Sequence, residues 1–231
     1  MRKLLFLVAL TLLPTPADAS CAYVGMTPNV LTRRDTKLPA DGGVLVGYTY
    51  GNDNDGEASG ADPSDVKWSA TNGKAKVTLT RTELAPGLSV YRPPVTVSAF
   101  KLVGKTKEHG SYTHEATSAP TAIAAPVAKA IKSKTTEGFR SMTTTTMLKL
   151  STAAPAEAVA IIAYDDTGKA LLYATLADTH DKILDFEIQE TGGHCGTPRP
   201  TGEGSLVGKI TFAYVDAFGR LSPKSKPVTA R

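Results

Sequence analysis

The chain has 231 residues, of which 41% are hydrophobic and 21% are charged, and its formal net charge is +4 at pH 7. This is the composition of a globular protein, and so small and dispersed a positive excess gives no argument for binding nucleic acid. No apolar run approaches the ~20 residues that a membrane-spanning helix needs, so we expect no transmembrane segment. The length suits either one large domain or two domains of about 100 residues.

The first nineteen residues resemble a leader rather than part of a fold. They begin with the basic Met1-Arg2-Lys3, continue through a largely apolar run at 4–13, and end in the small-x-small motif Ala17-Asp18-Ala19. This order is typical of a secretory signal peptide. We therefore predict a signal peptide at 1–19, cleavage after Ala19, and a periplasmic or extracellular location.

The two cysteines, Cys21 and Cys195, are the next feature. In an oxidising compartment an even number of cysteines favours a disulfide, which we predict between these two. The alternative is a lipid anchor at Cys21, because Ala19-Ser20-Cys21 is similar to the end of a bacterial lipoprotein signal. Such a signal would carry an aliphatic residue where Asp18 stands, so the disulfide is the preferred interpretation.

The first half of the mature chain alternates between apolar and polar residues in short segments separated by turn residues. This pattern predicts strands rather than helices, with tight turns at Asn72-Gly73 and Pro86-Gly87. We interpret 20–118 as a β-sandwich-like domain. Its expected strands are 44–50, 66–69, 74–81, 88–91, 95–103 and 111–118.

The second half follows a segment rich in Ala, Pro and Thr at 119–126, which we predict to be a linker. We interpret 127–231 as a second sandwich, with turns at 165–168 and 216–219. The run Val159–Tyr164 is apolar throughout, as expected of a central strand that is buried on both faces. The other expected strands are 127–131, 143–151, 169–176, 182–188, 206–215 and 227–230.

The stretch Ile210–Pro223 resembles the penultimate strand and last hairpin of a fibronectin type III or immunoglobulin-like domain. It contains an aromatic-x-aromatic pattern, then Asp-x-x-Gly, then Ser-Pro. The segment from Leu84 to Leu102 resembles a similar module in bacterial envelope proteins. With the strand pattern, these resemblances lead us to predict an all-β fold of one or two immunoglobulin-like antiparallel β-sandwich domains.

One acidic loop is a candidate calcium site. Asp53, Asp55 and Glu57 lie close together, and carboxylate oxygens are the ligands that Ca²⁺ prefers. The spacing does not match an EF-hand loop, and a solvated acidic loop explains the same residues. We therefore predict no metal and retain these three residues as a minor candidate.

Three aromatic residues, Tyr48, Tyr50 and Trp68, allow two interpretations. They could form a face on which a sugar or peptide stacks. Alternating aromatic residues in strands more often fill a core, and this is the interpretation we prefer for Trp68.

No catalytic motif is present: the chain lacks Gly-x-Ser-x-Gly and Cys-x-x-Cys. We predict no enzyme, no catalytic residues and no cofactor. The expected function is that of a secreted or periplasmic binding or structural protein of the bacterial envelope, whose partner is a protein or glycan. The alternative is a secreted hydrolase or hydrolase inhibitor with a site assembled from distant residues. A loss of enzymatic activity on substitution of His180 or His194 would favour this alternative.

Overall fold

The computed structural model describes residues 25–51, 67–104, 107–115, 123–138, 141–176, 183–190, 206 and 208–230. Within these ranges the chain forms sixteen strands and no helix, so the predicted all-β class is confirmed. Several sequence predictions concern residues outside them and stay predictions. These are the leader at 1–19, Cys21, Asp53, Asp55, Glu57, His180, His194 and Cys195.

Strands β1 to β9 form two sheets. The first is antiparallel and contains, in order, β1 (Gly25–Val30), β3 (Val44–Gly51), β7 (Leu88–Arg92) and β6 (Thr80–Ala85). The second contains β2 (Lys37–Leu38), β9 (Glu108–His114), β8 (Ala99–Val103), β4 (Ser69–Asn72) and β5 (Ala75–Val77), with β2 parallel to β9. Between the sheets lies the N-terminal core: Leu38, Val44, Val46, Tyr48, Ala70, Tyr91, Phe100, Leu102 and Tyr112.

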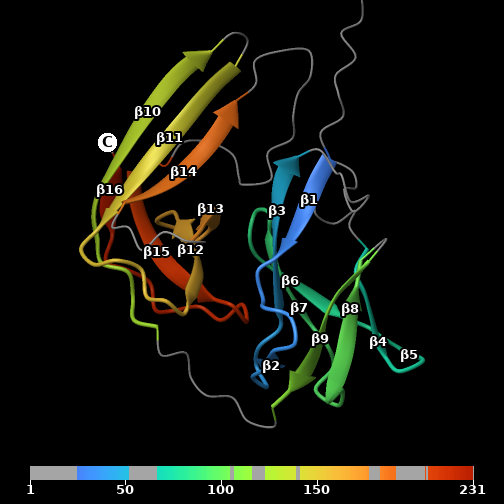
Figure 1. Ribbon diagram of the computed structural model, residues 1–231. Coiled ribbons are helices and arrows are strands. Elements are labelled where there is room, and N and C mark those ends of the chain that lie inside the picture. The colour runs from blue at the N-terminus through green and yellow to red at the C-terminus, as the bar shows by residue number, and fades with distance from the viewer. Residues whose placement is uncertain are drawn as a thin grey trace, which may run out of the picture.

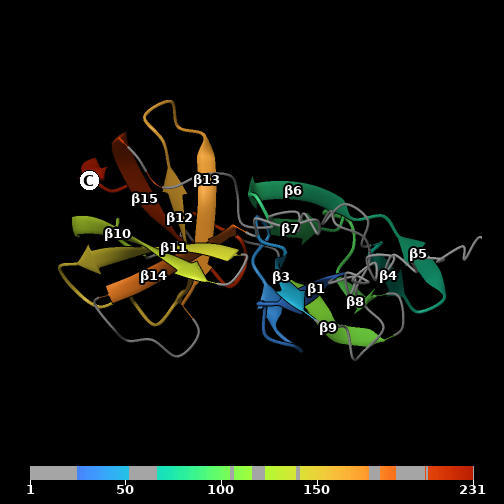
Figure 2. The ribbon, with the colours of Figure 1, turned by 90° about the horizontal axis from the view of Figure 1, so that it is seen from above.

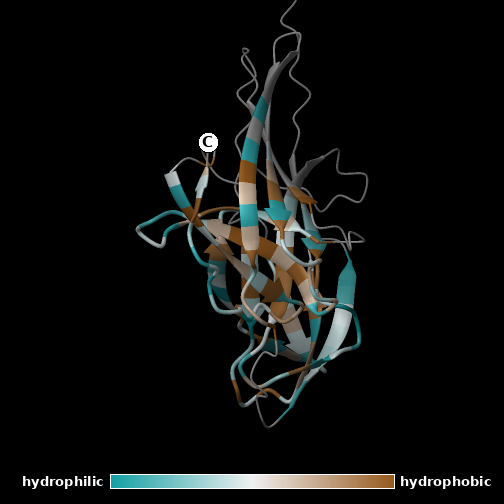
Figure 3. Ribbon diagram, turned by 90° about the vertical axis from the view of Figure 1, so that its left-hand side faces the viewer, coloured by the Kyte–Doolittle hydropathy of each residue, from teal (hydrophilic) through white to brown (hydrophobic). Residues whose placement is uncertain are grey.

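Strands β10 to β16 form two further sheets beside the first pair (Figures 1 and 2). One contains the long strands β10 (Ala128–Gly138), β11 (Ser141–Leu150) and β14 (Ile183–Glu190). The other contains β13 (Ala170–Thr175), β12 (Ala158–Tyr164), β15 (Gly208–Asp216) and β16 (Val228–Ala230). They enclose the C-terminal core, which includes Ile131, Leu148, Ile161, Leu172 and Phe212. Hydrophobic residues gather along the strands of the body, whereas many connecting segments are hydrophilic (Figure 3).

The expected strand at 74–81 is wrong in one respect, because it is two strands in two different sheets. β5 ends at Val77 and β6 begins at Thr80, so the chain crosses between the sheets at 78–79. Val77 and Leu79 both pack against the N-terminal core. The period-two pattern therefore continues through the crossing and hides it.

Other boundaries in the first half also differ from the prediction. The strand expected at 66–69 is β4, which begins only at Ser69 and ends at Asn72. The expected strand at 95–103 begins only at Ala99, because the Val97 N–H donates to the Pro94 carbonyl and closes a turn. β9 begins at Glu108 rather than at 111. Its alternation is interrupted by an extra residue near its start, which makes the strand hard to recognise.

The tight turns follow the expected chemistry. Pro86-Gly87 connects β6 to β7, and the φ of Gly87 is +75°, the conformation that a type II turn requires of its third residue. The turn after β4 is shifted by one residue. Asn72 pairs with Ala75, so the connecting residues are Gly73-Lys74 rather than Asn72-Gly73.

The predicted linker at 119–126 overlaps the described residues at its end. Ile123 is only 4% exposed and packs in the C-terminal core. This end of the segment therefore packs in the C-terminal half, and the linker at 119–126 stays a prediction. The division into domains at 20–118 and 127–231 stays a prediction.

The expectation for Val159–Tyr164 is confirmed and has a specific cause. Strand β12 lies between β13 and β15, and its alternate side chains serve two different clusters. Ile161 and Ala163 belong to the C-terminal core, whereas Ala160, Ile162 and Tyr164 belong to a third cluster on the opposite face. Both faces are apolar because both are covered.

Candidate functional site

The third cluster, which we call the joint cluster, joins the two halves of the chain. It places the sheet of β1, β3, β7 and β6 against the sheet of β13, β12, β15 and β16. Burying a large apolar side chain contributes roughly 1.5–3 kcal/mol, so separating the halves would expose a costly surface. The buried members are Leu45, Ala85, Leu88 and Val90 from the first half and Ala160, Ile162, Tyr164, Tyr173, Ala213 and Val215 from the second.

A turn at residues 216–220, which we call the joint turn, follows β15 at the edge of this cluster. One carboxylate oxygen of Asp216 accepts from the backbone N–H groups of Phe218 and Arg220, both at 2.9 Å. The Gly219 N–H donates to the Asp216 carbonyl at 3.1 Å, and the φ of Gly219 is +75°. Asp and Gly are suited to this turn because Asp can hold its own backbone and Gly tolerates positive φ.

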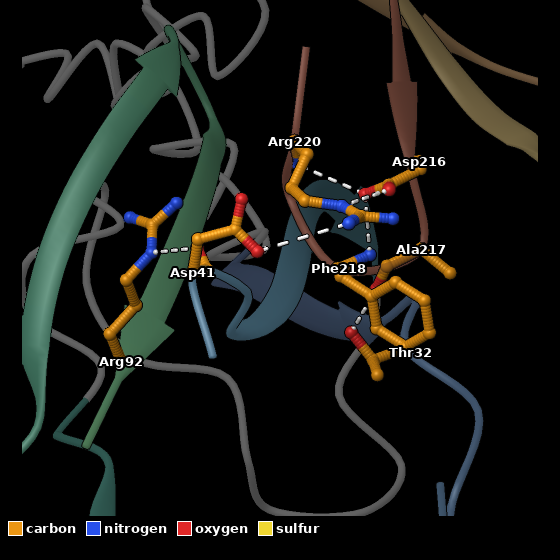
Figure 4. Close-up of polar contacts among 7 residues, drawn as sticks. All are labelled: Thr32, Asp41, Arg92, Asp216, Ala217, Phe218 and Arg220. Carbon is orange, nitrogen blue, oxygen red and sulfur yellow. Dashed lines mark hydrogen bonds and ion pairs between the residues drawn. The ribbon is translucent and has the colours of Figure 1, made fainter. Parts of the chain in front are cut away.

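Hydrogen bonds to backbone carbonyls of the joint turn tie it to the first half, and Figure 4 shows the one that the Thr32 hydroxyl donates. The Gly43 N–H donates to the Phe218 carbonyl at 2.9 Å. The Thr32 hydroxyl, which is buried, donates to the Ala217 carbonyl at 2.5 Å and accepts from the Leu45 N–H at 2.7 Å. These bonds fix the turn at one position, because a shift would leave buried polar groups unpaired.

Charged groups extend the same contact, as Figure 4 shows. The Arg220 Nε donates to the second carboxylate oxygen of Asp216 at 2.7 Å, and its Nη1 lies 3.8 Å from a carboxylate oxygen of Asp41. Arg92 donates from Nε to the Asp41 carbonyl at 3.2 Å, and burial lowers the pKa of Arg92. The Asp216 side chain is 5% exposed and that of Asp41 53%, so the first ion pair is much less screened by water.

Tyr173 forms a second clamp between the halves. Its hydroxyl donates to the Tyr48 carbonyl at 3.1 Å and accepts from the Tyr48 N–H, which also donates to the Gly87 carbonyl. Gly47 leaves room for this approach, because a Cβ there would lie 3.0 Å from the hydroxyl. Burial raises the pKa of Tyr173 to about 12.

The aromatic residues form a hydrogen-bonded group in the first half. The Tyr48 and Tyr91 hydroxyls lie 2.8 Å apart, and the indole Nε1 of Trp68 donates to the Tyr48 hydroxyl at 2.9 Å. Burial raises the pKa of both tyrosines. Tyr48 is 0% exposed, so its ring offers no face to a sugar or peptide and belongs to the core. Trp68 is half-buried against the same core, and the side chain of Tyr50 lies outside the described residues.

A hollow of about 260 Å³ lies between β1 and the start of β9. Thr32 belongs both to its lining and to the joint. Within the part of the chain that the structure describes, no group of three or more His, Cys, Asp or Glu side chains could hold a metal ion. The same part contains no helix of the length and apolarity needed to cross a membrane. The residues lining the hollow are Pro28, Asn29, Val30, Thr32, Arg34, Lys107 and His109.

The sequence predicted the turn at 216–219 but not its contact with the first half of the chain. Nothing in an Asp-x-x-Gly motif says what packs on it. The one usable signal was the fully apolar Val159–Tyr164, which indicated that this strand needs a cover on each face. The hollow gave no signal, because its residues come from distant parts of the sequence.

Comparisons with known proteins add little. No model of a known protein family matches the chain, and no curated protein matches it. Among solved structures, the chain is similar to one described as the BSP domain of a biofilm-associated protein, with 11% sequence identity and a TM-score of 0.24. The match covers 88% of this chain and 29% of that chain.

Proposed function

We propose that the chain is a non-catalytic binding or structural protein of the bacterial envelope, and that its two halves act as one rigid body. The observation that carries the proposal is the joint. Domains that share only a linker move relative to one another, whereas a large apolar interface holds them together. Here the apolar joint cluster, the joint turn and the Tyr173 clamp all act between the same two sheets.

Export belongs to the same proposal and is supported by the leader-like residues 1–19. The partner would be an envelope protein or glycan that contacts the edges or end loops of the two sandwiches. Immunoglobulin-like sandwiches and a bridge between Cys21 and Cys195 are the finer form of this proposal. Such a bridge would add a covalent tie between the start of the mature chain and its second half.

The experiment compares variants of the joint in intact cells. A tagged chain is expressed in a Gram-negative host, the leader is mapped by mass spectrometry, and envelopes are cross-linked before capture. We expect an exported protein that captures the same partner as wild type when Asp165 is changed to Ala, because the hydrogen bonds of Asp165 all lie within its own turn and none reaches the first half. The variant Asp216→Ala should capture less of it, since the halves are no longer held in one orientation.

Two results would overturn the proposal. One is retention of the full-length chain, leader included, in the cytoplasm. The other is turnover of a hydrolase substrate by the purified protein that disappears when His180 or His194 is changed, because that would establish the enzymatic alternative. Thermal melting of each variant, measured first, sets a working temperature at which all of them are folded.

A further inference from the structure

The hollow between β1 and β9 is built by an irregularity in β9. On strand β8, Leu102 pairs with Gly110 and Val103 pairs with Glu108, so His109 is an extra residue in the ladder. Such a bulge redirects a side chain that would otherwise follow the alternation of the strand. As a result His109 and Tyr112, which are three residues apart, are both buried.

Gly110 makes this arrangement possible. Its φ is +150°, and a Cβ at this position would lie 3.1 Å from Cγ of Arg34 and 3.2 Å from the Tyr112 hydroxyl. A residue with a side chain would be strained in this conformation and would crowd Arg34. The backbone therefore allows Arg34, from the loop after β1, to lie against β9.

The lining of the hollow is polar and cationic. Arg34 and Lys107 carry positive charge, and Asn29 and His109 add groups that can donate hydrogen bonds, whereas the hydroxyl proton of Thr32 is already donated to the Ala217 carbonyl. None of the described lining residues is a carboxylate, and Arg34 forms no salt bridge among the residues that the structure describes. Asp35 lines a neighbouring hollow, with Arg33, Arg34 and Thr36, but not this one.

The inner side of the hollow is fixed by aromatic contacts. The imidazole of His109 meets the indole of Trp68 edge to face, with ring centroids 4.8 Å apart and planes at 73°. Trp68 is held in turn by its hydrogen bond to Tyr48. The position of His109 is thus determined by the core, which makes the hollow a preformed feature.

We propose that this hollow binds a small oxyanion, a carboxylate or phosphate group, held by Arg34 and Lys107 with His109 at its inner side. Arginine presents paired donors that match a carboxylate or phosphate, and lysine adds a second positive charge. A volume of about 260 Å³ is slightly below the roughly 300–1,000 Å³ of pockets for drug-sized ligands. It suits a free ion or the charged end of a larger envelope molecule.

The test is an NMR titration of the full-length protein with inorganic phosphate, with glucuronate and with glucose, at constant ionic strength. We expect a saturable shift of the His109 ring signals with phosphate or glucuronate and none with glucose. Stronger binding of glucuronate would identify an acidic sugar as the source of the group, and stronger binding of phosphate would identify a phosphate.

Three variants locate the binding. Arg34→Ala and Lys107→Ala should each weaken the affinity about tenfold or more, as expected for a lost charge-assisted hydrogen bond. Arg33→Ala is the matched control, because Arg33 is an exposed neighbour that does not line this hollow, and it should change the affinity less than about twofold. Unchanged melting temperatures would show that the variants are folded.

The proposal is overturned if neither anion gives a saturable shift, if glucose binds equally well, or if Arg33→Ala weakens binding as much as Arg34→Ala. The last result would mean that diffuse positive charge attracts the anion. This inference does not depend on the proposed function, because the titration reports on the ring of His109 and the three variants change residues outside the joint cluster and the joint turn.

Discussion

Two turns of the second half have the same local chemistry and opposite surroundings. In the turn after β12, one carboxylate oxygen of Asp165 accepts from the N–H groups of Thr167 at 3.0 Å and Lys169 at 2.8 Å. Gly168 has a φ of +86°, and its N–H donates to the Asp165 carbonyl at 3.1 Å. The joint turn at 216–220 repeats every one of these features with Asp216 in the place of Asp165.

The difference lies in what the two turns contact. A Cβ on Gly168 would lie 3.5 Å from the flexible end of Lys224, whereas a Cβ on Gly219 would lie 2.6 Å from Cγ2 of Val90 in the other half. Asp165 is not buried, whereas Asp216 is 4% exposed. In both turns Asp and Gly determine the backbone conformation. The contacts that surround the turn determine how much it contributes to the free energy of unfolding.

The largest expected effect separates the two glycines. Gly219→Ala should lower the free energy of unfolding by about 3–4 kcal/mol, because it combines an unfavourable backbone conformation with overlap against Val90. Gly168→Ala incurs only the backbone cost, about 1–2 kcal/mol. Urea denaturation measures both. Equal losses would mean that the joint tolerates the added methyl group and is looser than the contact indicates.

The next effect separates the two carboxylates. Asp216→Ala should cost about 2–3 kcal/mol, since it removes the acceptor of two backbone N–H groups and leaves Arg220 without its close partner. Asp165→Ala should cost less, because water can satisfy the exposed N–H groups of that turn. The comparison would fail if the two variants unfolded at the same urea concentration.

The sequence predicted the turns well and the joint poorly, for a physical reason. Turn formation is local, so Asp216 and Gly219 identify the turn from four consecutive residues. The contact of Gly219 with Val90 and of Tyr173 with Tyr48 depends on residues far apart in the chain. The sheet crossing at 78–79 was missed because both sides of it bury apolar residues in the same phase. His109 was hidden by a bulge, which interrupts the alternation from which a buried position is inferred.

High pH should weaken the joint through Tyr173. Its pKa in the folded protein is about 12, compared with 10.0 when exposed, so the unfolded chain ionises first. The stabilisation that depends on the neutral hydroxyl is therefore complete below pH 10 and lost as the pH rises toward 12, by about 2–3 kcal/mol. Urea denaturation at each pH gives the free energy of unfolding as a function of pH. In Tyr173→Phe this free energy should fall less between pH 10 and 12.

Tyr112→Phe provides the control for that measurement. Burial also raises the pKa of Tyr112 to about 12, but Tyr112 belongs to the N-terminal core and not to the joint. In both variants the free energy of unfolding should fall less steeply between pH 10 and 12 than in the wild-type protein. Only Tyr173→Phe should also lower stability at neutral pH, by about 1 kcal/mol, because it alone removes hydrogen bonds across the joint. If Tyr112→Phe lowered the stability at neutral pH as much as Tyr173→Phe, the assignment of Tyr173 as a clamp would be contradicted.

The smallest effect concerns the exposed turn and acid. The hydroxyl of Thr167 donates to Asp165 at 2.7 Å and, with the backbone N–H groups, holds the pKa of Asp165 below its usual 3.8. A carboxyl with a lowered pKa stabilises the fold at pH values above its pKa in the unfolded chain, and this contribution is lost as the pH falls through its pKa in the folded protein.

Because Asp165 is exposed, its pKa is a better readout than the stability of the whole chain. In an NMR titration, Thr167→Val should move the pKa of Asp165 back toward 3.8, whereas Thr167→Ser, which keeps the hydroxyl, should leave it low. If Thr167→Val left the pKa unchanged, the backbone alone would hold the carboxylate, and the two turns would owe their shared conformation entirely to Asp and Gly.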